Sequence, residues 1–151
     1  MSTACALEFD EAWIANRNSL VLVTGAAGFV GSRVVASLLR LGCERVRCGV
    51  RRSSDLGLLQ ACIPPERAHC CEIVEANLLS RDECRRLTAD VEVVYHLVAG
   101  RGKSFPGCFQ GSVVTTRNLL DALREQGQLK RFVNVSSFAV YSRFQSKRSS
   151  V

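Results

Sequence analysis

The stretch SLVLVTGAAGFVG, residues 19–31, joins two kinds of secondary structure through three glycines. Its first six residues are rich in leucine and β-branched side chains, which is typical of a short strand buried on both faces of a sheet. From Phe29 to Leu41 the apolar residues fall at helical spacing, and Gly42 stands where a helix would end in the left-handed conformation. The stretch therefore predicts a strand, a glycine turn and a helix, in that order.

The same alternation of apolar runs and helical patterns continues along the chain. Further strands are expected at 45–50, 71–75, 91–99 and 131–136, and further helices at 80–88 and 109–126. Ser80 and Glu83 have the spacing of a capping box at the start of the first of these helices, and Gly127 closes the second. Strands that alternate with helices form right-handed crossovers. The sequence therefore predicts an α/β fold, a Rossmann-type doubly wound parallel sheet of about five strands.

The glycine turn carries the strongest functional signal. Glycine lets the backbone turn tightly and approach a pyrophosphate, which the N–H groups and dipole of the following helix attract. A buried strand before the glycines and an amphipathic helix after them are the context that a dinucleotide site requires. The residues predicted to hold this part of the cofactor are Gly25, Ala27, Gly28, Phe29, Val30 and Gly31.

Residues 24–31, TGAAGFVG, resemble the fingerprint of the extended short-chain dehydrogenases/reductases, the NAD(P)-dependent epimerase/dehydratase family. Stretches 94–99, 116–122 and 131–141 resemble that family's fourth strand, the helix after it and its fifth strand, so the resemblance spans residues 20–142 in the correct order. The chain departs from the family pattern at Asn77, where the family commonly has Asp, at Ser112, where many members have Asn, and at Ser142, which replaces the glycine of the fifth-strand motif. The resemblance implies further cofactor contacts from Asn77, Leu78, Leu97, Val98, Ala99 and Ser112.

The choice of cofactor can be argued from the end of the second predicted strand. An NAD-preferring site usually offers Asp or Glu there to the ribose hydroxyls, whereas this chain has Arg51 and Arg52. A guanidinium suits a 2′-phosphate, so NADP is the preferred cofactor and NAD the alternative. The competing interpretation is that these arginines simply face solvent.

The catalytic residues that the resemblance implies are only partly present. In the family a tyrosine acts as general acid/base, a lysine four residues later lowers its pKa, and a Ser or Thr hydrogen-bonds the substrate oxygen. Alignment of the fifth strand puts that hydroxyl on Ser137, unless Ser137 only caps the strand end. The nearest candidates for the tyrosine and lysine, Tyr141 and Lys147, are six residues apart and would lie on different faces of a helix.

Two functional hypotheses follow. In the first, the chain is the cofactor-binding part of an NADP- or NAD-dependent oxidoreductase, epimerase or dehydratase, truncated before the substrate-binding lobe and inactive alone. The resemblance implies an alcohol, ketone or nucleotide-sugar substrate, including 3β-hydroxysteroid-like alcohols. In the second, the chain is a non-catalytic dinucleotide-binding or redox-sensing regulatory protein. The fifth strand would form an exposed apolar edge, which favours association, for example as a homodimer.

Composition sets the remaining expectations. With 151 residues, of which 47% are hydrophobic, the chain should form one binding domain at 19–142, with an N-terminal extension at 1–18 and a tail at 143–151. The net charge of +6 comes from scattered basic pairs without a nucleic-acid motif, and no apolar run or export signal indicates a membrane, so a cytoplasmic protein is expected.

Three other motifs are given no function. The eight cysteines are interpreted as free thiols, mostly buried, and His69-Cys70-Cys71 has no further ligand pair at metal spacing, so no metal is expected. Residues 97–104 end in Gly-Lys-Ser but lack the first glycine of a phosphate-binding P-loop.

Overall fold

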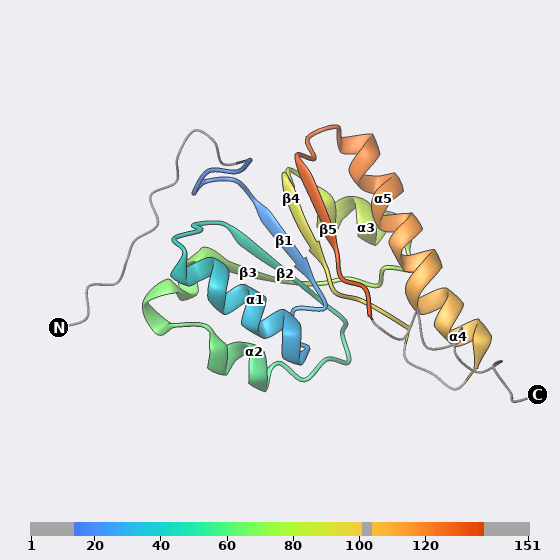
Figure 1. Ribbon diagram of the computed structural model, residues 1–151, viewed down its shortest axis with the longest axis horizontal. Helices are drawn as coiled ribbons and strands as arrows, with labels where there is room; N and C mark the ends of the chain where they lie inside the picture. The colour runs from blue at the N-terminus through green and yellow to red at the C-terminus, as the bar shows by residue number, and fades with distance from the viewer. Residues whose placement is uncertain (1–13, 101–103, 138–151) are drawn as a thin grey trace, which may run out of the picture.

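The computed structural model describes residues 14–100 and 104–137, which fold around a five-stranded sheet (Figure 1). The strands are β1 (Val21–Thr24), β2 (Val46–Val50), β3 (Cys71–Glu75), β4 (Val93–His96) and β5 (Arg131–Asn134). They lie in the order β3-β2-β1-β4-β5, and every neighbouring pair is parallel. The predicted doubly wound parallel sheet of the Rossmann type is confirmed.

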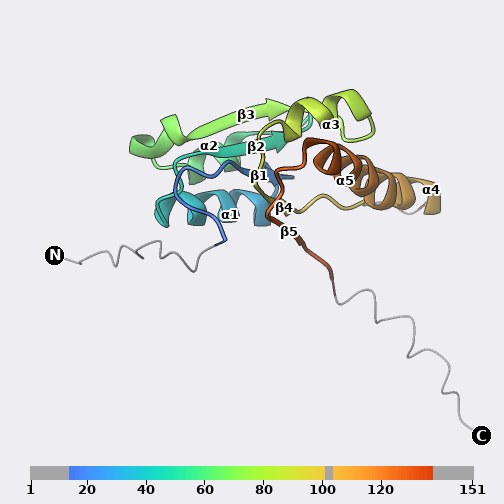
Figure 2. The same cartoon turned by 90° about the horizontal axis from the view of Figure 1, so that it is seen from above.

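Helices cover both faces of the sheet. They are α1 (Phe29–Arg40), α2 (Gly57–Cys62), α3 (Arg81–Thr88), α4 (Phe105–Phe109) and α5 (Thr115–Gln126), with a 3₁₀ turn at Pro65–Cys70 and a π-helical turn at Gln110–Val114. The helices α1 and α2 contact each other on one face, and α3 and α5 contact each other on the opposite face (Figure 2).

Two separate apolar cores fill the space between the sheet and these helices. Side chains along β1 alternate between them: Val21 and Val23 pack with Val35 and Leu39 of α1, whereas the cluster on the opposite face includes Leu22. In that second cluster lie Leu87 of α3 and Leu119 and Leu123 of α5. The first three residues of this central strand are apolar because each of their side chains enters one core or the other.

The predicted helix ends are confirmed by their backbone geometry. Gly42 has a φ of +91°, and its N–H and that of Cys43 donate to the carbonyls of Leu39 and Leu38, which closes α1 in a Schellman motif. Gly127 likewise follows α5 with a φ of +68°.

The capping box of α3 is only half present. The Ser80 hydroxyl accepts from the Glu83 N–H at 3.4 Å, as predicted. The Glu83 carboxylate, however, accepts from the N–H of Asn77 at 2.8 Å instead of from Ser80. Glu83 therefore fixes the chain three residues before the cap, at the end of β3.

The helical segment before β5 is longer than the predicted range 109–126. It begins at Phe105 and contains the π-helical turn, where a Cβ added to Gly111 would lie 2.6 Å from the Gly100 Cα. This close approach of two backbones is a tertiary contact that hydrophobic periodicity does not report. The helix α2 and the 3₁₀ turn were not predicted either, because both are too short to show a period.

Among the described residues, four cysteines are buried, three are half-buried and none forms a disulfide. The prediction of free, mostly buried thiols holds for these seven, and Cys5 lies outside the described residues. No helix in the described part of the chain has the length and apolar character needed to span a bilayer. The same residues contain no cluster of ligands that could hold a metal ion. The expected domain boundaries at 18, 142 and 143 remain predictions, and the last two lie outside the described residues.

Candidate functional site

The candidate site lies at the carboxyl edge of the sheet, where the loops after the strands gather (Figure 1). Strand β1 pairs with β2 on one side and β4 on the other, so the connections from this point lead to opposite faces. Ligands of open parallel sheets bind at such a topological switch point. Most of the predicted site residues fall in the loops that meet here.

The glycine turn after β1 packs against the segment after β4. Gly25 has a φ of +71°, and a Cβ added to it would lie 3.4 Å from the Leu97 carbonyl and from a Val98 methyl group. A Cβ on Gly31 would lie 2.1 Å from the Gly25 oxygen, which no side chain can occupy. Glycine is thus favoured at residue 25 by its left-handed backbone conformation and required at residue 31 by the close approach of α1 to the preceding turn.

The N-terminus of α1 can accept an anion. Its N-cap residue, Gly28, is exposed and has no side chain that could accept from the N–H groups of the first turn. Ala27 before it is half-buried, and Phe29 and Val30 after it are 70% and 54% exposed. A phosphate group satisfies free N–H groups of this kind and is favoured by the helix dipole. The geometry of this turn therefore fits a pyrophosphate.

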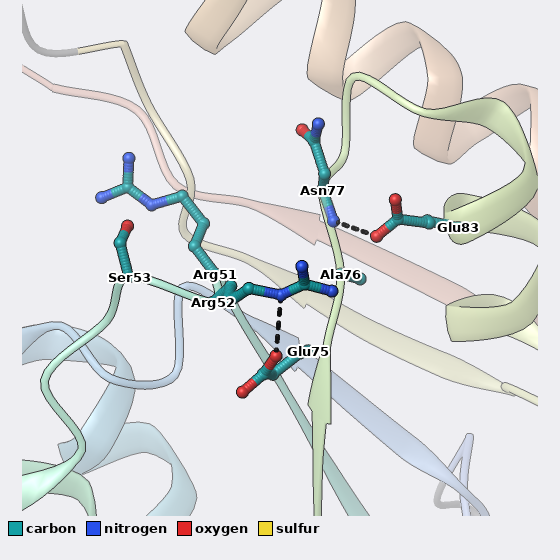
Figure 3. Close-up of a pocket in the computed structure, with 7 residues that line it drawn as sticks. All are labelled: Arg51, Arg52, Ser53, Glu75, Ala76, Asn77 and Glu83. Carbon is teal, nitrogen blue, oxygen red and sulfur yellow. Dashed lines mark hydrogen bonds and ion pairs between the residues drawn. The ribbon is translucent and has the colours of Figure 1, made fainter.

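A second part of the site is a cleft of about 490 Å³ between the ends of β2 and β3 (Figure 3). It is lined by Arg51, Arg52, Ser53, Glu75, Ala76, Asn77 and Glu83. The Nε of Arg52 lies 3.4 Å from an Oε of Glu75, and Figure 3 shows the Arg51 side chain pointing away from that pair. The structure thus brings both predicted arginines and Asn77 into one cleft with a hydroxyl and two carboxylates.

Side-chain hydrogen bonds of Asn77 and Asn118 hold the wall of the cleft at Asn77 and Leu78. The Asn77 side-chain oxygen accepts from the Leu79 N–H at 3.1 Å, while Leu78 is buried. The buried amide of Asn118 on α5 donates to the carbonyls of Leu78 and Leu79 at 3.0 and 3.1 Å. Sequence reasoning missed Asn118 because its partners lie about forty positions earlier in the chain.

A chain of hydrogen bonds holds the end of β4. His96 is buried, with Nδ1 2.7 Å from the Thr24 hydroxyl and Nε2 3.0 Å from the Thr116 hydroxyl. The Thr116 hydroxyl donates to the Ser112 carbonyl, so it accepts from His96 Nε2–H, and Nδ1 accepts from Thr24. The Thr24 oxygen in turn accepts from the Leu97 N–H at 3.3 Å.

This network keeps His96 neutral. Burial lowers the pKa of His96 to about 4, and both ring nitrogens already have the partners that a neutral imidazole needs. His96 therefore orients the backbone at Leu97 instead of carrying charge at neutral pH.

The segment after β4 is tied to the π-helical turn. The Ser112 hydroxyl accepts from the Gly100 N–H at 2.8 Å, while Leu97 and Val98 are half-buried and Ala99 is exposed. Residues at π-helical turns frequently serve functional sites. Ser112 thus fixes Gly100, the residue that follows Leu97, Val98 and Ala99.

Ser137 follows β5, three residues beyond the last strand residue Asn134, and its side chain is exposed. Its catalytic role remains a prediction. Tyr141 and Lys147 lie outside the described residues.

Four lining residues of the cleft were not predicted as site residues: Ser53, Glu75, Ala76 and Glu83. Ser53 follows the two arginines directly, and Glu75 ends a predicted strand beside them in the sheet, opposite Val50. A search for polar residues at the ends of neighbouring parallel strands would have found both. Glu83 was recognised only as a capping residue.

The fold and the glycine turn together define a dinucleotide-binding domain of the Rossmann class. Residues 21–151 match the family described as the NAD dependent epimerase/dehydratase family. The chain belongs to this family, whose solved neighbours are extended short-chain dehydrogenases/reductases.

Individual relatives agree with this assignment. The chain is 37% identical over 120 residues to sterol demethylase protein B of Methylococcus capsulatus, covering 78% of this chain and 34% of that protein. Uronate dehydrogenase from Agrobacterium tumefaciens is 30% identical with a TM-score of 0.61, over 81% of this chain and 42% of that one. UDP-glucuronic acid 4-epimerase from Bacillus cereus, solved with UDP-glucuronic acid and NAD, is 28% identical with a TM-score of 0.66. The match covers 87% of this chain and 43% of that one. The chain thus spans less than half the length of these relatives.

Proposed function

We propose that the chain binds a nicotinamide dinucleotide at the carboxyl edge of its sheet, as the cofactor-binding part of an extended short-chain dehydrogenase/reductase. The observation that carries the proposal is the exposed, uncapped N-terminus of α1 directly after the tight glycine turn. The first-turn N–H groups would hold the pyrophosphate. The cleft between β2 and β3 would hold the adenosine ribose.

The other predicted residues have distinct tasks in this proposal. Leu97, Val98 and Ala99 would line the nicotinamide side, with Ser112 holding their loop through Gly100. The bound dinucleotide would supply a hydride acceptor or donor. The hydroxyl of Ser137 would hydrogen-bond the substrate oxygen, a role supported by its location after β5 at the edge where such folds collect catalytic groups.

We further propose NADP as the preferred cofactor. The support is the presence of two arginines, Arg51 and Arg52, in the cleft next to the end of β2, since a guanidinium binds phosphate through charge-assisted hydrogen bonds. NAD is the alternative, and relatives that carry NAD in their solved structures favour it.

For substrate we propose an alcohol, ketone or nucleotide sugar, the last being what the epimerase from Bacillus cereus carries. The 151 residues contain no tyrosine followed four residues later by a lysine. We therefore expect these residues by themselves to bind the dinucleotide without turning over substrate. Binding without turnover is also what the regulatory hypothesis requires, so this expectation alone leaves both hypotheses standing.

Thermal unfolding with added dinucleotide tests the proposed function. NADP or NAD at one hundred times its Kd should stabilise the chain by about 2.7 kcal/mol. Gly28→Val should abolish this shift, because the added side chain would block the anion's approach to the helix N-terminus. Gly57→Val is the matched control: it makes the same change at an exposed glycine outside the cleft, so the shift should persist. A full shift in Gly28→Val, or none with either dinucleotide in the unmodified chain, would contradict the proposal.

A further inference from the structure

The cleft that is proposed to take the adenosine ribose is electrically balanced. Two cations, Arg51 and Arg52, line it together with two carboxylates, Glu75 and Glu83. Arginines alone would attract a 2′-phosphate strongly, whereas this arrangement offsets their charge. The preference for NADP or NAD should therefore depend on which group each carboxylate binds.

The two carboxylates are held differently. Glu83 accepts from the Asn77 N–H at 2.8 Å and so fixes the end of β3. Glu75 faces Arg52, with 3.4 Å between Oε2 and Nε, as the dashed line in Figure 3 shows. In the described structure, Arg52 is thus turned towards a carboxylate of the protein.

The pair of Arg52 and Glu75 is easy to open. Their side chains are 93% and 56% exposed, and exposed ion pairs are weak because water screens them and side-chain entropy opposes them. A phosphate dianion is a stronger partner for a guanidinium than a single exposed carboxylate. Arg52 can therefore exchange Glu75 for a ribose 2′-phosphate at a modest cost.

We propose that Glu75 is a specificity-determining residue: its carboxylate competes with the ribose 2′-phosphate for Arg52 and so lowers the preference for NADP over NAD. The inference rests on the proposed function, because it requires the cleft to take the adenosine ribose. NAD has a hydroxyl in place of the 2′-phosphate and does not need Arg52 to leave Glu75. The competition therefore acts on one dinucleotide and not on the other.

The test is a comparison of Kd values for NADP and NAD by calorimetric titration at low salt. Glu75→Gln should tighten NADP binding about two- to fivefold, the worth of an exposed ion pair, and leave the Kd of NAD within about twofold. Glu72→Gln is the matched control. Glu72 lies on the same strand, is 57% exposed and pairs with Arg47 outside the cleft, so removing its charge should leave the NADP to NAD ratio unchanged.

A double-mutant cycle shows whether Glu75 acts through Arg52. In an Arg52→Gln background, Glu75→Gln should no longer change the NADP to NAD ratio, because no guanidinium remains to be released. An unchanged ratio in Glu75→Gln alone, or an undiminished gain in the Arg52→Gln background, would overturn the inference while dinucleotide binding itself stands. Failure of every variant and of the unmodified chain to bind either dinucleotide would instead contradict the proposed function.

Discussion

At the scale of single residues, Gly31 is the position where one added atom matters most. A Cβ there would lie 2.1 Å from the Gly25 oxygen and 2.9 Å from the Ala26 Cα, so it would meet backbone atoms and not the end of a flexible side chain. The first turn of α1 can therefore approach the preceding loop only because residue 31 has no side chain.

We expect Gly31→Ala to destabilise the protein by about 1–3 kcal/mol through overpacking, although alanine is the better helix former. Gly57→Ala is the control, since its new Cβ would meet only the end of the Asp55 side chain, at 3.3 Å. Urea denaturation of both variants measures the effect. A Gly31→Ala variant as stable as the control would show that the turn can relax.

Some site residues can be predicted from the sequence, and others only from the structure. Gly25, Gly28 and Gly31 are recognisable because their spacing sits between a strand pattern and a helix pattern. The pairing of Glu75 with Arg52 and the role of Asn118 are not, because both depend on partners from other elements: Glu75 on β3 meets Arg52 in the loop after β2, and Asn118 reaches Leu78 from α5. Local periodicity cannot report such contacts.

At the scale of elements, α3 is joined to the sheet through Arg47 of β2. The Arg47 side chain is 13% exposed, and its Nη1 donates to the carbonyls of Leu87 and Ala89 at 2.9 and 2.8 Å. These carbonyls lie at the C-terminal end of α3, where helix carbonyls lack partners in the helix. A cation is also favoured there by the helix dipole.

Arg47→Met should therefore destabilise the protein by about 2 kcal/mol, because nearly buried carbonyls lose a charged donor. Arg85→Met is the comparison: Arg85 forms ion pairs with Asp82 and Glu125 on the exposed surface, and its loss should lower the free energy of unfolding far less. Equal losses in the two variants, measured by urea denaturation, would refute the capping role of Arg47.

Element order was predictable, whereas the exact extent of the elements was less so. Five strands and three of the helices follow from apolar runs and capping residues. The π-helical turn does not, because it depends on Gly111 meeting Gly100 and on Ser112 accepting from the Gly100 N–H. Short elements such as α2 also depend on contacts with neighbours, here with α1.

At the scale of the whole molecule, the sheet separates two cores that share only the strands between them. The network of Thr24, His96 and Thr116 is buried at the carboxyl end of β1 and β4 and reaches α5. These hydrogen bonds therefore connect the central strands β1 and β4 to helix α5 on one face of the sheet. Protonation of His96 would place a charge inside this packed region.

The stability of the whole molecule should consequently depend on pH below neutrality. His96 has a folded-state pKa of about 4, below the value of about 6.5 for an unfolded chain. Between these values only the unfolded state binds the proton, so stability is full above about pH 6.5 and falls as the pH drops towards 4. The loss amounts to about 3 kcal/mol over that interval.

Denaturation between about pH 7 and pH 5 tests this expectation, in a range where most carboxylates stay ionised. His96→Gln should flatten the pH dependence relative to the unmodified chain, and His69→Gln, at an exposed position, should not. Should His96→Gln fail to fold, the imidazole resonances of the unmodified protein give the answer directly. A His96 resonance that titrates above about pH 5.5 would contradict the argument, because burial of the ring should hold its pKa well below that of a free histidine.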